Sequence, residues 1–245
     1  MTTPNNLFSH LVEMRDRLLR IVIGILLISF ALFPFANEIY HIMATPLLNS
    51  LPAGGQMIAT EVTTPFFVPM KMVLLVAFLL ASPYTLYQVW AFIAPGLYNN
   101  ERRLIAPLII SSVVLLISGM AFAYFLVFPV VFGFITSTAP EGVAVMTDIS
   151  KYFDFAISLF IAFGLAFETP VVVVLLVKAG VVSIVALRNA RSYVIVGAFV
   201  LGAIVTPPDV ISQFMLAIPM WLLYEVGILV ASMSKNKVHI EQNQY

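Results

Sequence analysis

Six long apolar runs constrain the fold of this chain more than any other feature of its sequence. In chain order they are approximately Leu18–Ala36, Phe67–Ala94, Leu104–Ile135, Tyr152–Val177, Ser192–Val205 and Phe214–Ser232. A helix of about 20 apolar residues crosses a bilayer core of about 30 Å, so each run is a candidate membrane span. Only 10% of the 245 residues are charged, against roughly 25% in a soluble domain. The sequence therefore predicts an all-α integral membrane protein with six transmembrane helices.

The runs differ in length, and several contain a proline. As a helix, the third run would measure about 45 Å and should tilt or protrude, whereas the fifth would reach only about 21 Å. Pro83, Pro129, Pro170 and Pro219 lie inside the second, third, fourth and sixth runs. Each of these prolines removes one backbone hydrogen bond, which favours a bend in the helix.

The distribution of lysine and arginine predicts the orientation of the spans. If both termini lie on one side, ten basic residues share that side and only Lys71 and Lys151 fall near the other. Basic residues concentrate in short cytoplasmic segments, so both termini are predicted to be cytoplasmic. We expect one membrane domain over residues 1–233 and a polar cytoplasmic tail over residues 234–245. The ten basic residues are Arg15, Arg17, Arg20, Arg102, Arg103, Lys178, Arg188, Arg191, Lys235 and Lys237.

Composition also excludes several classes of function. The formal net charge is zero, which argues against a nucleic-acid partner, and the absence of cysteine removes thiolate chemistry. His10, His41 and His239 are far apart and form no metal-binding pattern, and no nucleophile elbow or phosphate-binding loop is present. An intramembrane hydrolase is disfavoured for the same reasons. We expect no catalytic residue, no metal site and no cofactor.

The loop after the first span contains the sequence EIYHIMATPLLNSL. Its apolar residues Ile39, Ile42, Met43 and Leu47 recur at helical spacing, which indicates a short helix lying in the membrane interface. An ordinary ordered loop accounts for the pattern equally well.

Two acidic residues are predicted to lie at the cytoplasmic face. Glu13 belongs to the amphipathic segment FSHLVEMRDRLLR, and Glu101 stands just before Arg102 and Arg103. Glu13 fits a solvated charged face, and Glu101 fits a first-turn acid favoured by the helix dipole. Alternatively, two carboxylates on one face could each bind a guanidinium through paired charge-assisted hydrogen bonds.

Three polar residues are predicted within or beside the membrane. Glu168 lies in the fourth span, Glu225 in the sixth, and Gln213 near the far-side ends of the last two spans. A charge at membrane depth costs about 2.5–3.5 kcal/mol, so such groups usually face protein or water and serve a function. The structural alternative is a neutral Glu168 bonded to backbone groups that Pro170 leaves free. Composition and charge leave two classes open, a translocase component and a proton-coupled transporter of a small solute that uses Glu168. The absence of an internal repeat argues against the transporter.

Seven segments in order resemble the TatC family, the multispanning core subunit of the twin-arginine protein translocase. They are HLVEMRDRLL, MIATEVTTPFF, YQVWAFIAPGLYNNERR, GMAFAYFLVFPVVFGF, FGLAFETPV, GAFVLGAIVTPPDVISQ and AIPMWLLYE. The resemblance extends from His10 to about Ile228, and the departures lie in the tail and the connector SIVALRNARSYV.

The resemblance implies roles for particular residues. Glu13 and Glu101 would recognise the paired arginines of a signal peptide, and Arg15 and Phe92 would help to shape that site. Glu168 corresponds to the fourth-span acid of the family. The positions linked to structure or transport are Pro46, Pro207, Pro208, Asp209 and Gln213.

The resemblance also implies a fold, partners and a location. The family fold is a concave, glove-like arrangement of six helices with short fifth and sixth helices. The partners would be single-span TatA and TatB subunits, signal peptides of folded cargo proteins and the lipid bilayer, with several copies in one hetero-oligomeric complex. The protein would be a non-enzymatic, multi-pass component of the bacterial cytoplasmic membrane, and the proton-motive force would drive export.

Overall fold

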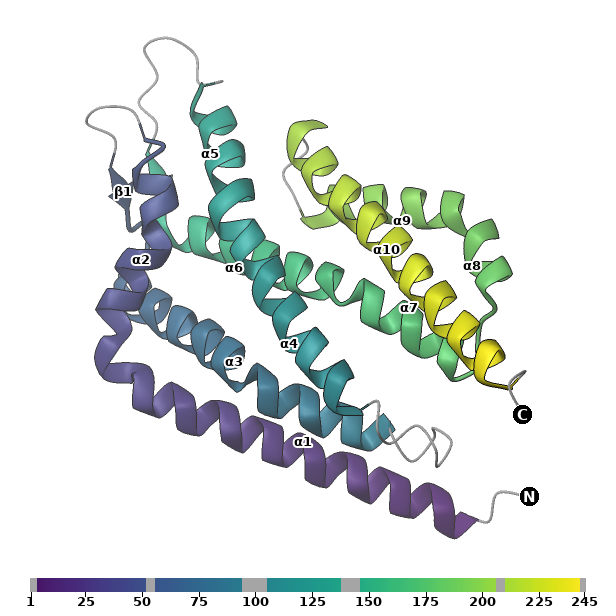
Figure 1. The fold of residues 1–245 in the computed structure, drawn as a ribbon. Helices are drawn as coiled ribbons and strands as arrows, with labels where there is room; N and C mark the ends of the chain where they lie inside the picture. The colour runs from purple at the N-terminus through teal and green to yellow at the C-terminus, as the bar shows by residue number, and fades with distance from the viewer. Residues whose placement is uncertain (1–3, 52–55, 94–104, 138–145, 206–209, 243–245) are drawn as a thin grey trace. The chain divides into compact units, whose positions relative to one another are not determined.

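A computed structural model describes residues 4–51, 56–93, 105–137, 146–205 and 210–242, and these residues are almost entirely helical (Figure 1). Each described residue belongs to one of the following elements or to a short connection between them. In chain order they are α1 (Pro4–Leu32), the 3-10 helix η1 (Phe33–Phe35), α2 (Ala36–Leu48), β1 (Met57–Ile58), α3 (Thr64–Ile93), α4 (Ile105–Phe122), the π-helix η4 (Ala123–Val127), α5 (Phe128–Ser137), β2 (Thr147–Asp148), α6 (Ile149–Phe167), α7 (Thr169–Lys178), α8 (Ile184–Asn189), α9 (Arg191–Val205) and α10 (Val210–Gln242).

The helices coincide with the apolar runs of the sequence. Five helical stretches in the described residues are long and apolar enough to cross a membrane, which confirms an all-helical membrane protein. The predicted fifth span corresponds to α9, whose 15 residues reach only about 22 Å. The five long stretches are His10–Leu48, Thr64–Phe92, Ala106–Phe134, Ile149–Lys178 and Val210–Met233.

The sixth helix corrects one expectation, because it is not short. Helix α10 has 33 residues, and the part of it that is apolar enough to cross a membrane has 24. The apolar run of the sequence is shorter than the helix because the polar residues that follow contain no glycine or proline to end it. The helix therefore continues to Gln242, into the segment predicted as a tail.

Two of the four predicted proline sites interrupt a helix. Helix α6 ends at Phe167 and α7 begins at Thr169, so Glu168 lies at the junction just before Pro170. Pro129 follows the π-helical segment η4, in which the regular helical hydrogen-bond pattern changes. Pro83 and Pro219 lie within the continuous helices α3 and α10.

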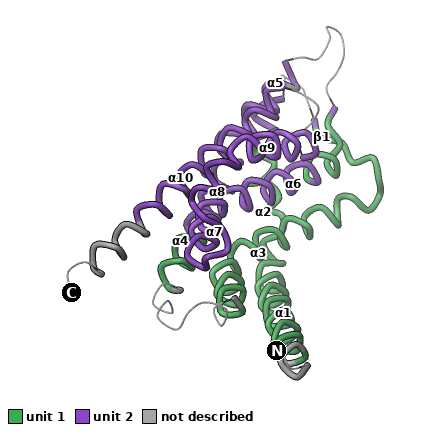
Figure 2. Tube along the Cα trace, turned by 90° about the vertical axis from the view of Figure 1, so that its right-hand side faces the viewer, with its two compact units in different colours: residues 1–45, 57–113, 147–153 green, residues 46–56, 114–146, 154–245 purple. Residues whose placement is uncertain are grey.

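The chain divides into two compact units, which Figure 2 distinguishes by colour. The first contains residues 1–45, 57–113 and 147–153, and in it α1 packs along α3 (Figure 1). The expected helix of the first loop is present as α2, which favours a helix over an irregular loop. Strands β1 and β2 pair in parallel, with Met57 opposite Thr147.

Hydrogen bonds join the two loops that carry these strands. Asp148 Oδ2 accepts bonds from the backbone N–H and the hydroxyl of Thr60, at 3.1 and 2.6 Å, and Asp148 Oδ1 accepts from the N–H of Lys151 at 3.0 Å. The bond to Lys151 caps the first turn of α6. One carboxylate therefore fixes both the strand pair and the start of a span. Tyr152 adds a hydroxyl bond of 2.8 Å to the carbonyl of Met43.

The second unit contains residues 46–56, 114–146 and 154–245. In it α10 packs against α7, α8 and α9, around a buried cluster of Val173, Leu187, Tyr224 and Ile228. Gly227 permits the close approach of α10 to α7, because a Cβ there would lie 3.0 Å from the Cα of Pro170.

Candidate functional site

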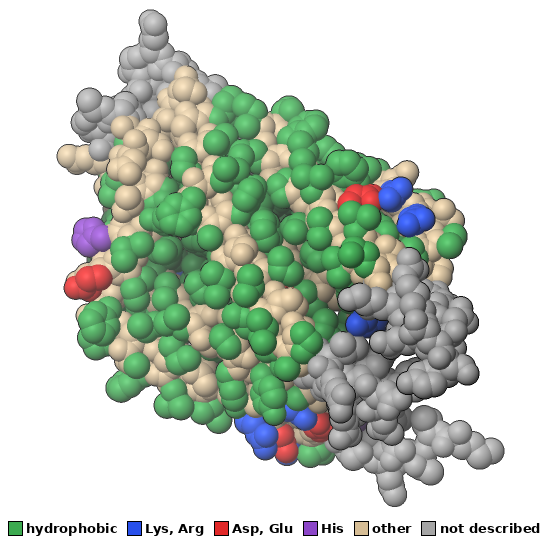
Figure 3. All heavy atoms as spheres, viewed as in Figure 1, with side chains coloured by type: hydrophobic (Ala, Val, Ile, Leu, Met, Phe, Trp, Pro, Cys, Tyr) green, Lys and Arg blue, Asp and Glu red, His purple; other side chains and the backbone are tan. Residues whose placement is uncertain are grey.

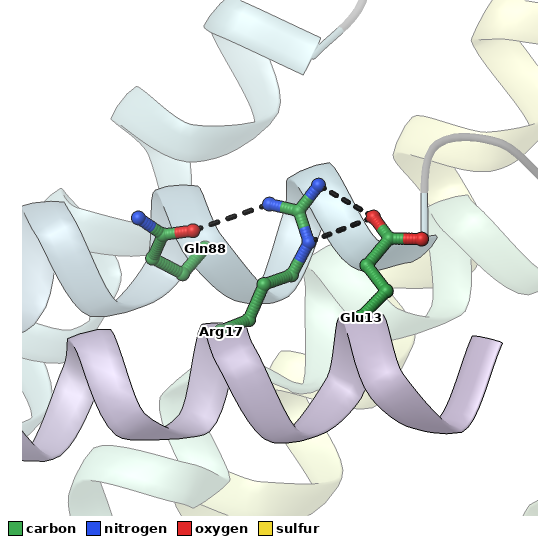
Figure 4. A network of polar contacts seen from close by, with 3 residues as sticks. All are labelled: Glu13, Arg17 and Gln88. Atoms are coloured by element: carbon green, nitrogen blue, oxygen red, sulfur yellow. Dashed lines mark hydrogen bonds and ion pairs between the residues drawn. The ribbon is translucent and has the colours of Figure 1, made fainter. Parts of the chain in front are cut away.

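A charged network occupies the N-terminal half of α1 and reaches α3 (Figure 4). Arg17 donates to Glu13 Oε1 from Nη2 at 2.7 Å and from Nε at 2.9 Å. Its Nη1 donates to the side-chain oxygen of Gln88, at 3.1 Å. Glu13 and Arg17 are four residues apart, so helix geometry alone brings them together. Gln88 is 71 residues away in the sequence and comes from the packing of α3 against α1.

The three residues of this network differ in their exposure to solvent. Gln88 is only 5% exposed, whereas the side chains of Arg17 and Glu13 are 22% and 38% exposed. The network thus runs from a buried amide to a carboxylate at the surface. Both bonds from Arg17 end on Oε1, and no other described residue donates to Oε2 of Glu13. Glu13 is held in one orientation and keeps one oxygen for a further donor.

Phe92 lies beside this network. Its ring stacks on His10 of α1, with ring centroids 4.3 Å apart and an interplanar angle of 14°. His10 and Glu13 are three residues apart, so they lie on neighbouring parts of one helix face. The structure therefore brings Phe92 and Glu13, both predicted site residues, to the same end of the α1–α3 pair.

Arg15, which the resemblance implies helps to shape the site, pairs with its neighbour Asp16. Its Nε and Nη2 donate to Asp16 Oδ1 at 3.0 and 2.8 Å, and the side chains of Arg15 and Asp16 are 66% and 45% exposed. Arg15 thus pairs with its sequence neighbour, whereas Glu13 pairs with Arg17. In this structure Arg15 contributes positive charge near the site and no direct bond to Glu13.

Several predicted residues lie outside the described part of the chain. These are Glu101, Pro207, Pro208 and Asp209. Pro46 is described: it is buried within α2, and its carbonyl accepts a bond of 2.8 Å from the Ser50 hydroxyl.

Glu168 occupies the break between α6 and α7. Its carbonyl accepts hydrogen bonds from the N–H groups of Val171 and Val172, both at 3.0 Å, so the backbone turns tightly there. The side chain is half-buried, and its Oε1 is fully buried. The predicted polar residue in the fourth span is thus at a helix junction rather than in a continuous helix.

Gln213 and Glu225 both connect α10 to α9. The side-chain amide of Gln213 donates to the carbonyl of Phe199 at 2.9 Å, and it packs over Gly202. Glu225 accepts a bond of 2.6 Å from Arg191 at the start of α9. Both contacts stabilise the packing of α9 against α10.

Sequence reasoning missed two members of the network around Glu13. Arg17 was recognised only as a basic residue, although its i+4 spacing from Glu13 carries the signal of the ion pair. Gln88 gave no signal, because its role depends on tertiary packing. Within the described residues, no three histidine or acidic side chains cluster in a way that could hold a metal ion.

The described surface agrees with a membrane setting. On the face shown in Figure 3, hydrophobic side chains cover most of the area and the charged side chains gather near its margins. The fold and this site define a class: a polytopic helical membrane protein with a charged, stabilised carboxylate at one end of its first hairpin of spans.

Comparison with known proteins identifies the family. Residues 9–219 match the sequence profile described as "Sec-independent protein translocase protein (TatC)". The TatC protein of Azotobacter chroococcum mcd 1 is 56% identical over 222 residues, which cover 91% of this chain and 87% of that protein. The TatC protein of Escherichia coli K12 is 54% identical over 222 residues, with 91% and 86% coverage. The chain belongs to the TatC family.

A solved structure agrees with this assignment. The structure described as "Crystal Structure of Twin Arginine Translocase Receptor- TatC" has a TM-score of 0.81 and 39% sequence identity to this chain. The match covers 92% of this chain and 99% of that one. The predicted family, the role as a translocase subunit and the absence of an enzymatic activity are confirmed. The sequence left two classes of protein open, and family membership selects the translocase component over the small-solute transporter.

Proposed function

We propose that this chain is the signal-peptide receptor of a twin-arginine translocase in a bacterial cytoplasmic membrane. It binds the paired arginines of the signal at the cytoplasmic face through Glu13 and Glu101. It then organises TatA- and TatB-type subunits, in a complex with several copies of each component, for export of folded proteins driven by the proton-motive force. Family membership supports the general role, and the geometry around Glu13 supports the site.

The observation that carries the proposal is the state of the Glu13 carboxylate. Arg17 holds Oε1, and buried Gln88 in turn holds Arg17. An incoming guanidinium can therefore meet a carboxylate that is already oriented and 38% exposed. Less side-chain entropy is lost on binding when the receptor group is fixed beforehand.

The chemistry of guanidinium supports the preference for arginine. Its planar fork can donate two parallel bonds to a carboxylate, or bridge Oε2 of Glu13 and a neighbouring acceptor. Lysine is a strongly hydrated point charge that lacks this fork. Phe92, stacked on His10, offers an apolar wall next to the charged group, against which the apolar part of the signal can begin.

The proposal also includes the orientation of the chain in the membrane and the arrangement of its helices. Ten basic residues against two support cytoplasmic termini. With α9 as the fifth span, the chain would have six transmembrane helices in the concave, glove-like arrangement expected for the family, as one membrane domain. Helix α9 falls short of a bilayer core of about 30 Å, so it would thin the membrane locally.

Glu168 has a narrower role in this proposal. It marks a polar point at a helix junction, and with the short α9 it offers a place for a partner helix. Partner helices in membranes are held by packing and by hydrogen bonds to polar side chains, which favours such a point. If Glu168→Ala leaves both partner assembly and export intact, this part of the proposal is wrong.

Site-specific photocrosslinking tests the receptor site. A twin-arginine signal carrying a photoreactive residue next to the arginines is added to membranes that contain the wild-type chain, Glu13→Gln or Glu101→Gln. Loss of one charge-assisted hydrogen bond costs about 1.5–3 kcal/mol, so each variant should lower crosslinking by roughly tenfold or more. A twin-lysine signal should crosslink weakly to all forms.

The matched control is Glu38→Gln. Glu38 is an exposed acid in the first turn of α2, and its removal changes the net charge by the same amount. Crosslinking should be unchanged in this variant. Equal crosslinking of the wild-type chain and Glu13→Gln would overturn the assignment of Glu13, whatever the control shows.

A further inference from the structure

A groove runs along the α1–α3 pair, one helical turn from the Arg17–Gln88 bond. Its volume is about 430 Å³, and its lining is apolar except at Arg20 and Tyr84. It lies entirely within the first compact unit. The residues that line it are Arg20, Ile23, Gly24, Leu27, Ile28, Ala81 and Tyr84.

Small residues produce the hollow. Gly24 has no side chain, and a Cβ there would lie 3.3 Å from the ring of Tyr84. Ala81, on the facing helix, is buried at the base and adds only a methyl group. Ile23 and Leu27 form the exposed wall on α1. The groove therefore has a shallow apolar floor and a raised apolar side.

Arg20 provides the charge at one end of this groove. It is exposed and lies within the first predicted span, at the depth where the apolar run begins. Among the described residues, no carboxylate pairs with it, unlike Arg15 and Arg17. An arginine side chain at the edge of the hydrocarbon extends toward the membrane interface, where its guanidinium can pair with an anionic group.

The length of the groove suits one acyl chain. From Arg20 to Ile28 the helix rises about 12 Å, and one leaflet of a core of about 30 Å is about 15 Å deep. Helix α1 is also widely exposed, with only 6% of its most apolar window buried. The groove is thus open along α1 over a length close to the depth of one leaflet.

We propose that this groove binds one anionic phospholipid, with the phosphate on the Arg20 guanidinium and an acyl chain along Gly24 and Ile28. Arginine recognises phosphate through paired charge-assisted bonds, and the apolar floor offers a chain no polar competitor. The charge of Arg20 disfavours the two alternatives. A twin-arginine signal would bring like charges together, and a two-fold contact with a second copy would bring the two Arg20 groups together.

Photolabelling of the full-length chain in nanodiscs tests the proposal. The discs contain phosphatidylcholine and a small fraction of phosphatidylglycerol with a photoreactive group on its acyl chain. We expect label on residues 20–28 and 81–84, and competition by unlabelled phosphatidylglycerol but not by added phosphatidylcholine. Arg20→Gln should lower the labelling about fivefold, the effect expected for one basic residue near an anionic lipid surface.

Two further variants sharpen the result. Arg188→Gln removes another exposed arginine, on α8, without a partner among the described residues, and it should leave labelling of α1 unchanged. Gly24→Leu fills the floor and should lower labelling of the groove while leaving Arg20 in place. Together the two variants distinguish a local binding site from a general attraction of anionic lipid to basic residues.

Three outcomes would overturn the proposal. Equal competition by phosphatidylcholine would show that the phosphate charge is not recognised. Competition by soluble glycerol phosphate would show an anion site without a lipid chain. Displacement of the label by a twin-arginine peptide in stoichiometric amount would assign the groove to the signal peptide.

Discussion

Arg17 donates two N–H groups to one oxygen of Glu13, rather than one to each carboxylate oxygen. The same guanidinium reaches Gln88 with its third nitrogen, so Arg17 bridges α1 and α3. Under the proposed function, Arg17 orients Glu13 from one oxygen and leaves the other oxygen for a guanidinium of the signal peptide. The strength of the proposed site should therefore depend on Arg17 as a positioning residue.

Arg17→Gln should weaken signal binding. The substitution removes the guanidinium 2.7 Å from the carboxylate and with it the bonds that orient Glu13. Ordering a free side chain on binding costs about 0.5–1.5 kcal/mol, so affinity should fall by about two- to tenfold. Titration of a fluorescent twin-arginine peptide into the purified chain measures this, and Arg188→Gln is the control for the change in net charge.

A gain of affinity in Arg17→Gln would contradict this positioning role. It would mean that Arg17 acts mainly as a competitor of the signal guanidinium for the charge of Glu13. Gln88→Leu separates the two roles, because it removes the bond from Arg17 to α3 and leaves the bond to Glu13. Under competition Gln88→Leu should have little effect on affinity, and under positioning it should weaken binding.

The link between Asp148 and Thr60 should depend on pH. The hydroxyl bond from Thr60 and the backbone bond from Lys151 hold the pKa of the Asp148 carboxyl below its ordinary value of 3.8. A lowered pKa in the folded state means that the link is fully present above the ordinary value. It is lost as pH falls through the lowered pKa.

Hydrogen exchange measures this transition. Protection of the N–H groups of Thr60 and Lys151 should hold from neutral pH down to about 4 and disappear in stronger acid, once the intrinsic exchange rate is corrected for pH. In Asp148→Asn the protection should be weak and independent of pH. A wild-type chain whose protection falls between pH 7 and 5 would show that another group controls the link.

The sequence predicts the parts of this molecule that depend on local pattern. Apolar run length located the five long apolar helices and the short helix α9, and Pro170 predicted the interruption next to Glu168. The i, i+4 spacing of Glu13 and Arg17 is also sufficient to predict their ion pair. Each of these features is determined by residues within a few positions of one another.

The remaining features depend on contacts between distant segments. Gln88 meets Arg17 only because α3 packs on α1, and Asp148 meets Thr60 across 88 residues. The extent of α10 was underestimated because its polar end has no apolar signal, although nothing in it breaks a helix. A pattern in one segment carries no information about which other segment completes its hydrogen bonds.

Gly119 should tolerate no side chain. A Cβ at this position of α4 would lie 2.6 Å from the carbonyl oxygen of Phe163 and 2.9 Å from the Cβ of Phe167, both on α6. Gly119→Ala would force the helices apart, at a cost of about 1–3 kcal/mol. Thermal unfolding in detergent should show a clear decrease in midpoint.

Gly197 is the matched control for this prediction. It is also within a helix, α9, and a Cβ there would meet no atom within 4 Å. Gly197→Ala should be neutral or stabilising by up to about 1 kcal/mol, because alanine restricts the unfolded chain. A similar loss of stability in both variants would mean that helix contact at Gly119 is not the cause.

The ion pair between Arg191 and Glu225 should respond asymmetrically to its two single substitutions. Glu225 is 21% exposed and Arg191 is 46% exposed, so the carboxylate is the more poorly solvated partner. Arg191→Gln leaves that carboxylate without its cation, which should cost about 1–3 kcal/mol. Glu225→Gln should cost less, because its amide oxygen can still accept from a guanidinium that water also reaches.

The exchanged pair completes this test. In the double variant Arg191→Glu and Glu225→Arg the attraction is restored with opposite polarity, so stability should recover part of the loss seen in Arg191→Gln. The unfolding midpoint of the purified chain in detergent measures all four forms. Equal losses in the two single variants, or an exchanged pair less stable than either, would show that packing of α9 on α10 matters and the ion pair does not.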